Sequence, residues 1–191
     1  KRQAHGAVAW RLGDHTAKRQ GRLSLNPARH LDPLGSIIVP ALSVLAGWGY
    51  LGWAKPVPVD HSQLRGGRNS ALVVALSGPM VNLALVGVAW LGFTMTWANT
   101  SELSGWAQVF FYLGLTNLWL TIVNLLPVPP LDGSAVLERA LPSSAWPRYL
   151  RIRPFLFPGL LGVLVVSAML HLGILEHLGS ALRDWWINLL L

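Results

Sequence analysis

The sequence contains no cysteine and few charged residues, and both absences narrow the class of protein. Without cysteine, the 191-residue chain cannot form a disulfide framework or a thiolate metal site. Charged residues make up 12% of the sequence, against about 25% in ordinary soluble domains. Apolar residues amount to 52%, which is too many for a disordered chain. The composition therefore indicates an integral membrane protein.

Negative charge is also scarce, since 15 Lys and Arg stand against 8 Asp and Glu and give a net charge of +7. The basic residues flank apolar runs, so they do not form the basic face of a module that binds a phosphate backbone. Positive charge in such places marks the cytoplasmic side of a membrane protein. We therefore expect no nucleic acid as a partner, but a lipid bilayer and other membrane proteins.

Three apolar runs reach the length of about 20 residues that a spanning helix needs. They cover residues 71–98, 106–126 and 155–175. A fourth run, residues 37–53, is shorter and is interrupted by Pro40, so it either spans tightly or re-enters the membrane. The predicted fold is an all-α polytopic membrane protein: a helical bundle with at least three clear transmembrane helices and a short or re-entrant apolar segment.

Two short segments favour extended structure. Residues 18–25 alternate loosely between polar and apolar side chains, and residues 53–59 carry two prolines at alternate positions, which suits an edge segment. The inverted repeats that many transporters contain are absent from the sequence. We expect a single membrane-embedded domain over residues 1–191, with an upstream helix missing from this sequence.

Asp132 is the most informative single residue. It comes directly after an uncharged run and three prolines between residues 127 and 130. A carboxylate at the edge of the hydrocarbon is costly and by default marks a functional site. Alternatively, Asp132 caps a helix over residues 136–141. Gly133 would permit a turn with positive φ directly after it.

Two further polar residues are candidates for chemistry. Asn124 lies near the end of the same apolar run, where its amide could bind a substrate carbonyl or a neighbouring helix. His5 begins a stretch of small residues that suits a helix packed closely against others.

Six segments, taken in order, resemble the site-2 protease family of intramembrane zinc metalloproteases. The resemblance covers roughly residues 4–142, and its segments are residues 4–14, 21–27, 30–35, 53–58, 77–82 and 124–133.

The resemblance implies a zinc-dependent chemistry. Family members hold zinc between the two His of an H-E-x-x-H helix and the Asp of a later Leu-Asp-Gly motif, and the motif Glu acts as general base on the zinc-bound water. Here the resemblance places the second His at His5, the Asp at Asp132 and a substrate-positioning Asn at Asn124. It also implies a multi-pass protein of a bacterial cytoplasmic membrane, with transmembrane helices as substrates or complex partners.

The first half of the zinc motif departs from the family. Lys1 stands at the position of the first His ligand, and Arg2 at the position of the general base. Protonated Lys has no lone pair for zinc, and Arg cannot take a proton from water. As written, the sequence predicts a non-catalytic binding or assembly subunit without zinc. The alternative is a zinc-dependent intramembrane endopeptidase, if residues 1–3 are not native.

Overall fold

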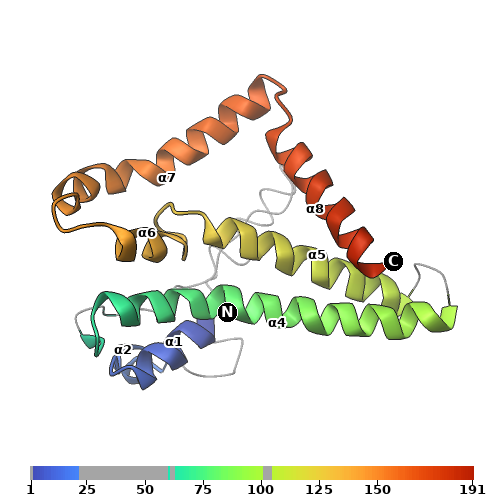
Figure 1. Cartoon of the computed structure of the whole chain (residues 1–191), viewed down its shortest axis with the longest axis horizontal. Helices are drawn as coiled ribbons and strands as arrows, with labels where there is room; N and C mark the ends of the chain where they lie inside the picture. Colours follow the sequence, from blue (N-terminus) through green and yellow to red (C-terminus); the bar gives the residue numbers. More distant parts are fainter. Residues whose placement is uncertain (1, 22–59, 61–62, 101–104) are drawn as a thin grey trace. The chain divides into compact units, whose positions relative to one another are not determined.

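The computed structural model describes residues 2–21, 60, 63–100 and 105–191, and all regular structure in these residues is helical (Figure 1). The helices are α1 (Arg2–Arg11), α2 (Thr16–Arg19), α4 (Arg68–Thr100), α5 (Gly105–Leu125), α6 (Ser134–Ala140), α7 (Trp146–Met169) and α8 (Ile174–Leu190).

Three of these helices are long and apolar enough to cross a membrane. The candidate spans are Arg68–Ala98 in α4, Gly105–Leu125 in α5 and Trp146–Ser167 in α7. The predicted all-α membrane fold with three clear spans is therefore confirmed, and the chain is a multi-pass membrane protein.

The third span lies earlier in the chain than the apolar run at residues 155–175 predicts. Helix α7 begins at Trp146 and includes three arginines before the apolar run starts. It ends at Met169, because His171 and Gly173 adopt positive φ values of 51° and 64° that turn the chain into α8. An apolar run locates the membrane segment, but a helix can begin in the interfacial region before it.

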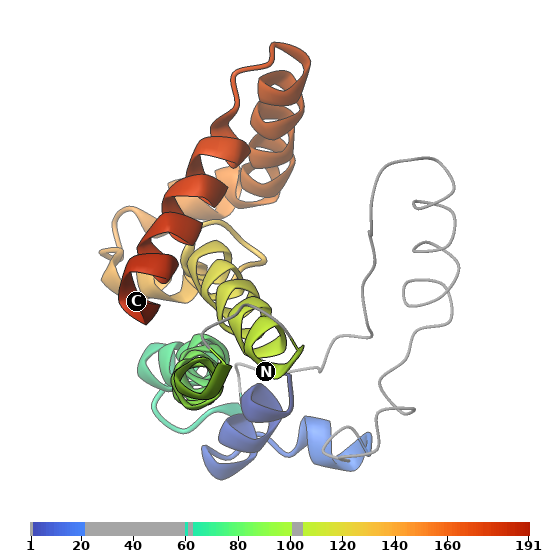
Figure 2. The same ribbon diagram turned by 90° about the vertical axis from the view of Figure 1, so that its right-hand side faces the viewer.

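The expected strand at residues 18–25 is wrong where the structure tests it. Lys18 and Arg19 belong to α2, a short helix that follows α1 after residues 12–15 (Figure 2). Residues 22–25, the apolar run at 37–53 and the extended segment at 53–59 lie outside the described residues.

The chain divides into an N-terminal unit, Lys1–Val74, and a C-terminal unit, Ala75–Leu191. The core of the N-terminal unit contains Ala9, Leu64 and Val74, with Val8, Leu12 and Ala71 packed against it. Small side chains on α1 allow this close packing, as the sequence predicts for the stretch after His5.

Asp14 organises the polar side of the N-terminal unit. The side chain is fully buried. Its Oδ1 accepts a hydrogen bond from the backbone N–H of Thr16 at 2.8 Å, and its Oδ2 accepts one from the N–H of Asp60 at 2.7 Å. Burial alone would raise the pKa of this carboxyl, but the hydrogen bonds outweigh it and hold the pKa below the ordinary value of 3.8.

Substituting Asp14→Asn is expected to destabilise the N-terminal unit by about 1–3 kcal/mol, because a charged acceptor of two buried N–H groups is lost. Since the folded-state pKa is lowered, the carboxylate stabilises the fold above pH 3.8 and that contribution disappears as the pH falls through the folded-state value. Thermal unfolding in detergent between pH 3 and 6 measures both effects. The exposed control Asp184→Asn should change neither, and an equal response of the two variants would contradict the assignment.

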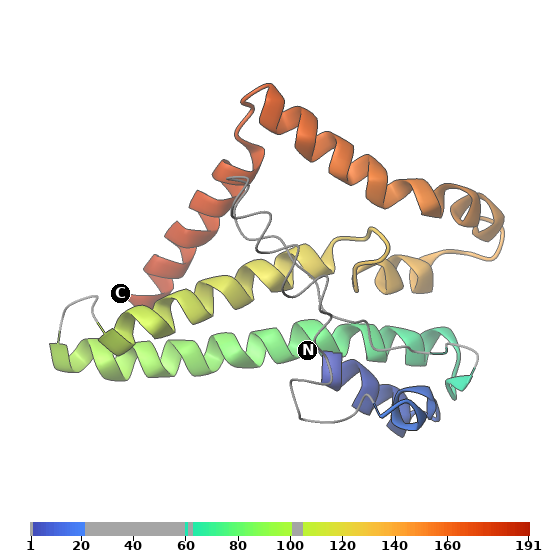
Figure 3. The ribbon, with the colours of Figure 1, turned by 180° about the vertical axis from the view of Figure 1, so that it is seen from behind.

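The C-terminal unit is built on α4 and α5, which run antiparallel side by side (Figures 1 and 3). Their contact contains Val86, Ala89 and Phe93 of α4 and Ala107, Phe111 and Leu118 of α5. The Phe93 and Phe111 rings lie 6.3 Å apart between centroids. Large apolar side chains elsewhere on α4 are exposed, including Met80, Val88 and Met95, as expected for a helix surrounded by lipid.

Helix α8 packs on α5 through Trp186, and Trp186 and Leu190 belong to the same core as the α4 and α5 residues. The indole N–H donates a hydrogen bond of 3.1 Å to the carbonyl of Phe111. A Cβ at Gly114 would lie only 2.2 Å from the Trp186 ring, so glycine is required for this approach. Helices α7 and α8 meet at the turn that joins them and diverge from it (Figure 1).

Candidate functional site

The loop that carries Asp132 folds back on the end of α5. The N–H of Gly133 donates a 2.7 Å hydrogen bond to the carbonyl of Asn124, and the N–H of Leu131 donates one of 2.9 Å to the carbonyl of Val128. Because proline has no backbone N–H, few residues of this loop can donate a hydrogen bond, and these two bonds fix the path of its backbone. Asn124 and Asp132 are thereby brought together at one end of α5.

Gly133 is required for a reason that differs from the expected one. Its φ is −61°, so the prediction of a positive-φ turn is wrong. Instead, a Cβ at this position would lie 2.0 Å from the carbonyl oxygen of Leu125. The loop can therefore approach the helix end only because residue 133 has no side chain.

Asp132 does not cap the following helix. Helix α6 begins at Ser134, its N-cap is Gly133, and no side chain makes a capping hydrogen bond. The interpretation of Asp132 as a helix cap is therefore wrong. Its Oδ2 is buried, and a functional role for this carboxylate stays a prediction.

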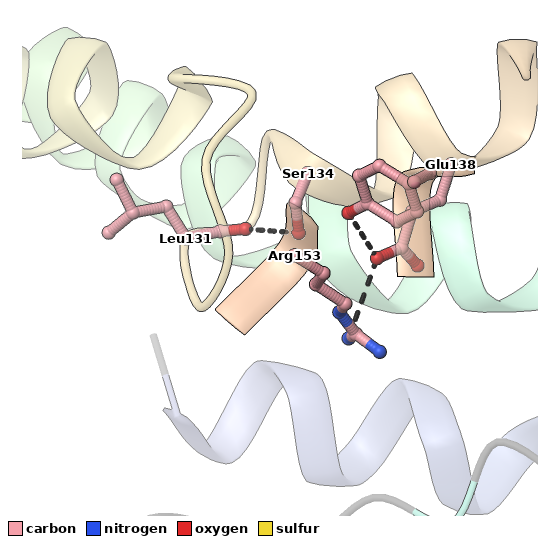
Figure 4. Close-up of polar contacts among 5 residues, drawn as sticks. Leu131, Ser134, Glu138 and Arg153 are labelled. Atoms are coloured by element: carbon pink, nitrogen blue, oxygen red, sulfur yellow. Dashed lines mark hydrogen bonds and ion pairs between the residues drawn. The ribbon is translucent and has the colours of Figure 1, made fainter. Parts of the chain in front are cut away.

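Hydrogen bonds and an ion pair hold α6 in place after the loop (Figure 4). The Ser134 hydroxyl donates a 2.8 Å hydrogen bond to the carbonyl of Leu131. Glu138 accepts a 2.7 Å hydrogen bond from the hydroxyl of Tyr149, and its Oε1 lies 3.4 Å from Nη2 of Arg153. Helix α7 thus holds α6 in place. Because α6 begins at Ser134, this also fixes the position of the chain directly after Gly133.

Asn124 lies on the last turn of α5 and is half-buried. Its Nδ2 donates a hydrogen bond of 2.5 Å to the carbonyl of Leu120 in the same helix. This bond fixes the rotamer of the amide and directs its nitrogen along the helix.

The remaining candidate residues belong to the N-terminal unit. His5 is half-buried on α1, and its Nε2 is buried. Arg2 begins α1, and Lys1 lies outside the described residues.

Two of the candidate side chains carry atoms of the kind that zinc binds. His5 Nε2 and Asp132 Oδ2 are buried and are chemically suitable ligands. A catalytic zinc uses three protein ligands. In the part of the chain that the structure describes, no three His, Cys, Asp or Glu side chains gather into a group that could hold a metal ion.

One buried polar residue lies in an uncharged span of the sequence, at the end of the segment 77–82, and no functional role was predicted for it. Asn82 in α4 is 3% exposed, and among the described residues its Nδ2 has no hydrogen-bond partner. The Gly78–Pro79 pair beside it suggests only a kink or close helix packing. The available signal was an amide inside an otherwise apolar span, where polar groups are costly.

Comparison with known proteins finds similarity to one family and to proteins named as zinc metalloproteases. The model of the family described as "Peptidase family M50" matches residues 92–166. The protein named "Putative zinc metalloprotease YwhC" from Bacillus subtilis is 39% identical over 144 residues, which cover 73% of this chain and 63% of that protein. "Putative zinc metalloprotease Rip2" from Mycobacterium tuberculosis strain Erdman is 35% identical over 198 residues, which cover 95% of this chain and 74% of that protein.

A further relative, also named "Putative zinc metalloprotease Rip2", comes from Mycolicibacterium smegmatis and is 35% identical over 70% of this chain. The chain covers 50% of that protein and 63% of the Bacillus protein. No solved structure shows a significant match.

Proposed function

This chain belongs to the site-2 protease family, peptidase family M50, and from that premise we propose that it is a member with an incomplete zinc site, which binds transmembrane helices without cleaving them. The membrane we propose is the bacterial cytoplasmic membrane, in line with the bacterial relatives.

The observation that carries this proposal is the pair of cations at positions 1 and 2 of the sequence. Lys1 and Arg2 occupy the positions at which the resemblance expects a His ligand and the Glu base. Neither side chain can do the required chemistry, because Lys is protonated and Arg retains its proton at all working pH values. His5 and Asp132 remain as two donors where three are needed.

The binding half of the proposal rests on the parts of the scaffold that are retained. The loop between α5 and α6 keeps Asn124 beside Asp132, through the hydrogen bond from Gly133 to the Asn124 carbonyl. An amide such as that of Asn124 at a membrane helix end can donate a hydrogen bond to a backbone carbonyl of another segment. A transmembrane helix is therefore the proposed ligand.

A second candidate function is zinc-dependent cleavage of transmembrane helices. The names of the relatives favour it, since each is called a zinc metalloprotease. It requires that residues 1–3 differ in the functional protein.

The two candidates are separated by a binding assay on the chain in lipid nanodiscs. The probe is a fluorescent synthetic transmembrane peptide with a Leu/Ala core, competed by excess unlabelled peptide. The proposal expects saturable binding with the peptide recovered intact by mass spectrometry. Recovery of cleaved peptide would support the endopeptidase instead, and an absence of binding would contradict the proposed function.

A further inference from the structure

Asn82 differs from the buried polar side chains of α5. Asn117 and Thr121 in α5 donate hydrogen bonds of 2.8 Å to the carbonyls of Leu113 and Asn117 in their own helix. The Nδ2 of Asn82 has no such acceptor among the described residues, although only 3% of the residue is exposed. An unsatisfied donor in an apolar interior is costly, so its retention calls for an explanation.

The face of α4 that carries Asn82 also packs on α5. Val86, Ala89 and Phe93 follow Asn82 at helical spacing, and all three belong to the core shared with α5. Asn82 therefore lies one turn beyond that contact, on the same stripe, toward the end of α5.

The level of Asn82 along the bundle can be read from the aromatic contact. Phe93 faces Phe111 in antiparallel helices. Eleven residues before Phe93 comes Asn82, and eleven residues after Phe111 comes Ile122. Eleven residues of an α-helix advance about 16 Å along its axis. Asn82 thus lies at the level of the last turn of α5, which contains Asn124.

We propose that Asn82 is a substrate-positioning residue: its side-chain amide donates a hydrogen bond to a backbone carbonyl of a transmembrane segment bound beside Asn124 and Asp132. This inference rests on the proposed binding of transmembrane helices. The bound segment has to replace the side chains that now cover the amide.

The chemistry of the donor specifies which segments it recognises. In an intact transmembrane helix the carbonyls are already bonded within the helix. A segment whose helix is locally broken exposes carbonyls that need a donor inside the membrane. Asn82 should therefore favour broken segments over continuous helices.

The test compares two synthetic 25-residue transmembrane peptides in nanodiscs, one with a continuous Leu/Ala core and one with a central Gly-Pro pair. The unmodified chain is expected to bind the Gly-Pro peptide about two- to tenfold more tightly, the range given by one hydrogen bond. Asn82→Ala should abolish this preference. Asn117→Ala is the matched control, because that amide is similarly buried but already bonded to its own helix, and it should keep the preference.

Thermal unfolding in detergent distinguishes positioning from a structural role. Asn82→Ala removes an unsatisfied donor, so its midpoint should equal or exceed that of the unmodified chain. A lowered midpoint would overturn the inference, as would a preference that survives in Asn82→Ala. Equal binding of both peptides by the unmodified chain would overturn the inference alone, whereas binding of neither would overturn the proposed function and the inference with it.

Discussion

The double substitution Lys1→His with Arg2→Glu is expected to give about one zinc per chain and to produce cleavage of a transmembrane peptide. The imidazole at position 1 would add a third donor to His5 and Asp132. The carboxylate at position 2 would supply a base, which typically contributes about 10²- to 10⁴-fold to a rate. Elemental analysis and mass spectrometry of the peptide measure the two effects.

The single variants separate the two roles. Lys1→His alone should bind zinc but cleave at least about 100-fold more slowly than the double variant, because the base is still absent. Arg2→Glu alone should do neither. Adding His5→Ala to the double variant should remove the zinc. A double variant that folds and remains free of zinc would show that His5 and Asp132 are not ligands of one ion.

Substituting Gly133→Ala is expected to destabilise the C-terminal unit by about 3 kcal/mol and to displace the Asp132 loop from α5. The new Cβ would lie 2.0 Å from the Leu125 carbonyl oxygen and 2.5 Å from that of Leu126. Both obstacles are backbone atoms, which cannot rotate away as a side chain could. Thermal unfolding in detergent measures the loss, and hydrogen exchange at residue 133 reports whether its bond to the Asn124 carbonyl survives.

Gly162→Ala in α7 is the matched control for this prediction. A Cβ at Gly162 meets nothing within 4 Å, so the variant should be as stable as the original or up to about 1 kcal/mol more stable, through higher helix propensity. If Gly133→Ala behaved like Gly162→Ala, the tight approach of the loop to α5 would be contradicted.

The spans could be predicted from the sequence because burial in lipid demands long apolar runs. The ends of α7 could not, because they depend on interfacial arginines and on the positive φ values at His171 and Gly173. Hydropathy does not encode either. The expectation at residues 18–25 failed at Lys18 and Arg19, where a short helix forms next to Asp14.

The candidate site was predictable in part for similar reasons. Asp132 stood out because a carboxylate beside an apolar run is costly. The need for Gly133 arises from the approach of residues 125 and 133, which a turn preference does not reveal. Asn82 was visible as an amide within an uncharged span, but its role could not be predicted, because only burial and the positions of its neighbours distinguish an unsatisfied amide from one that bonds to its own helix, as Asn117 does.

The most direct test of the incomplete zinc site is the zinc content of the purified, folded chain, measured by elemental analysis. The proposal predicts less than about 0.1 zinc per chain, because only two donors of the required three are present. About one zinc per chain, lost on Asp132→Asn, would contradict the account and establish an intact metal site.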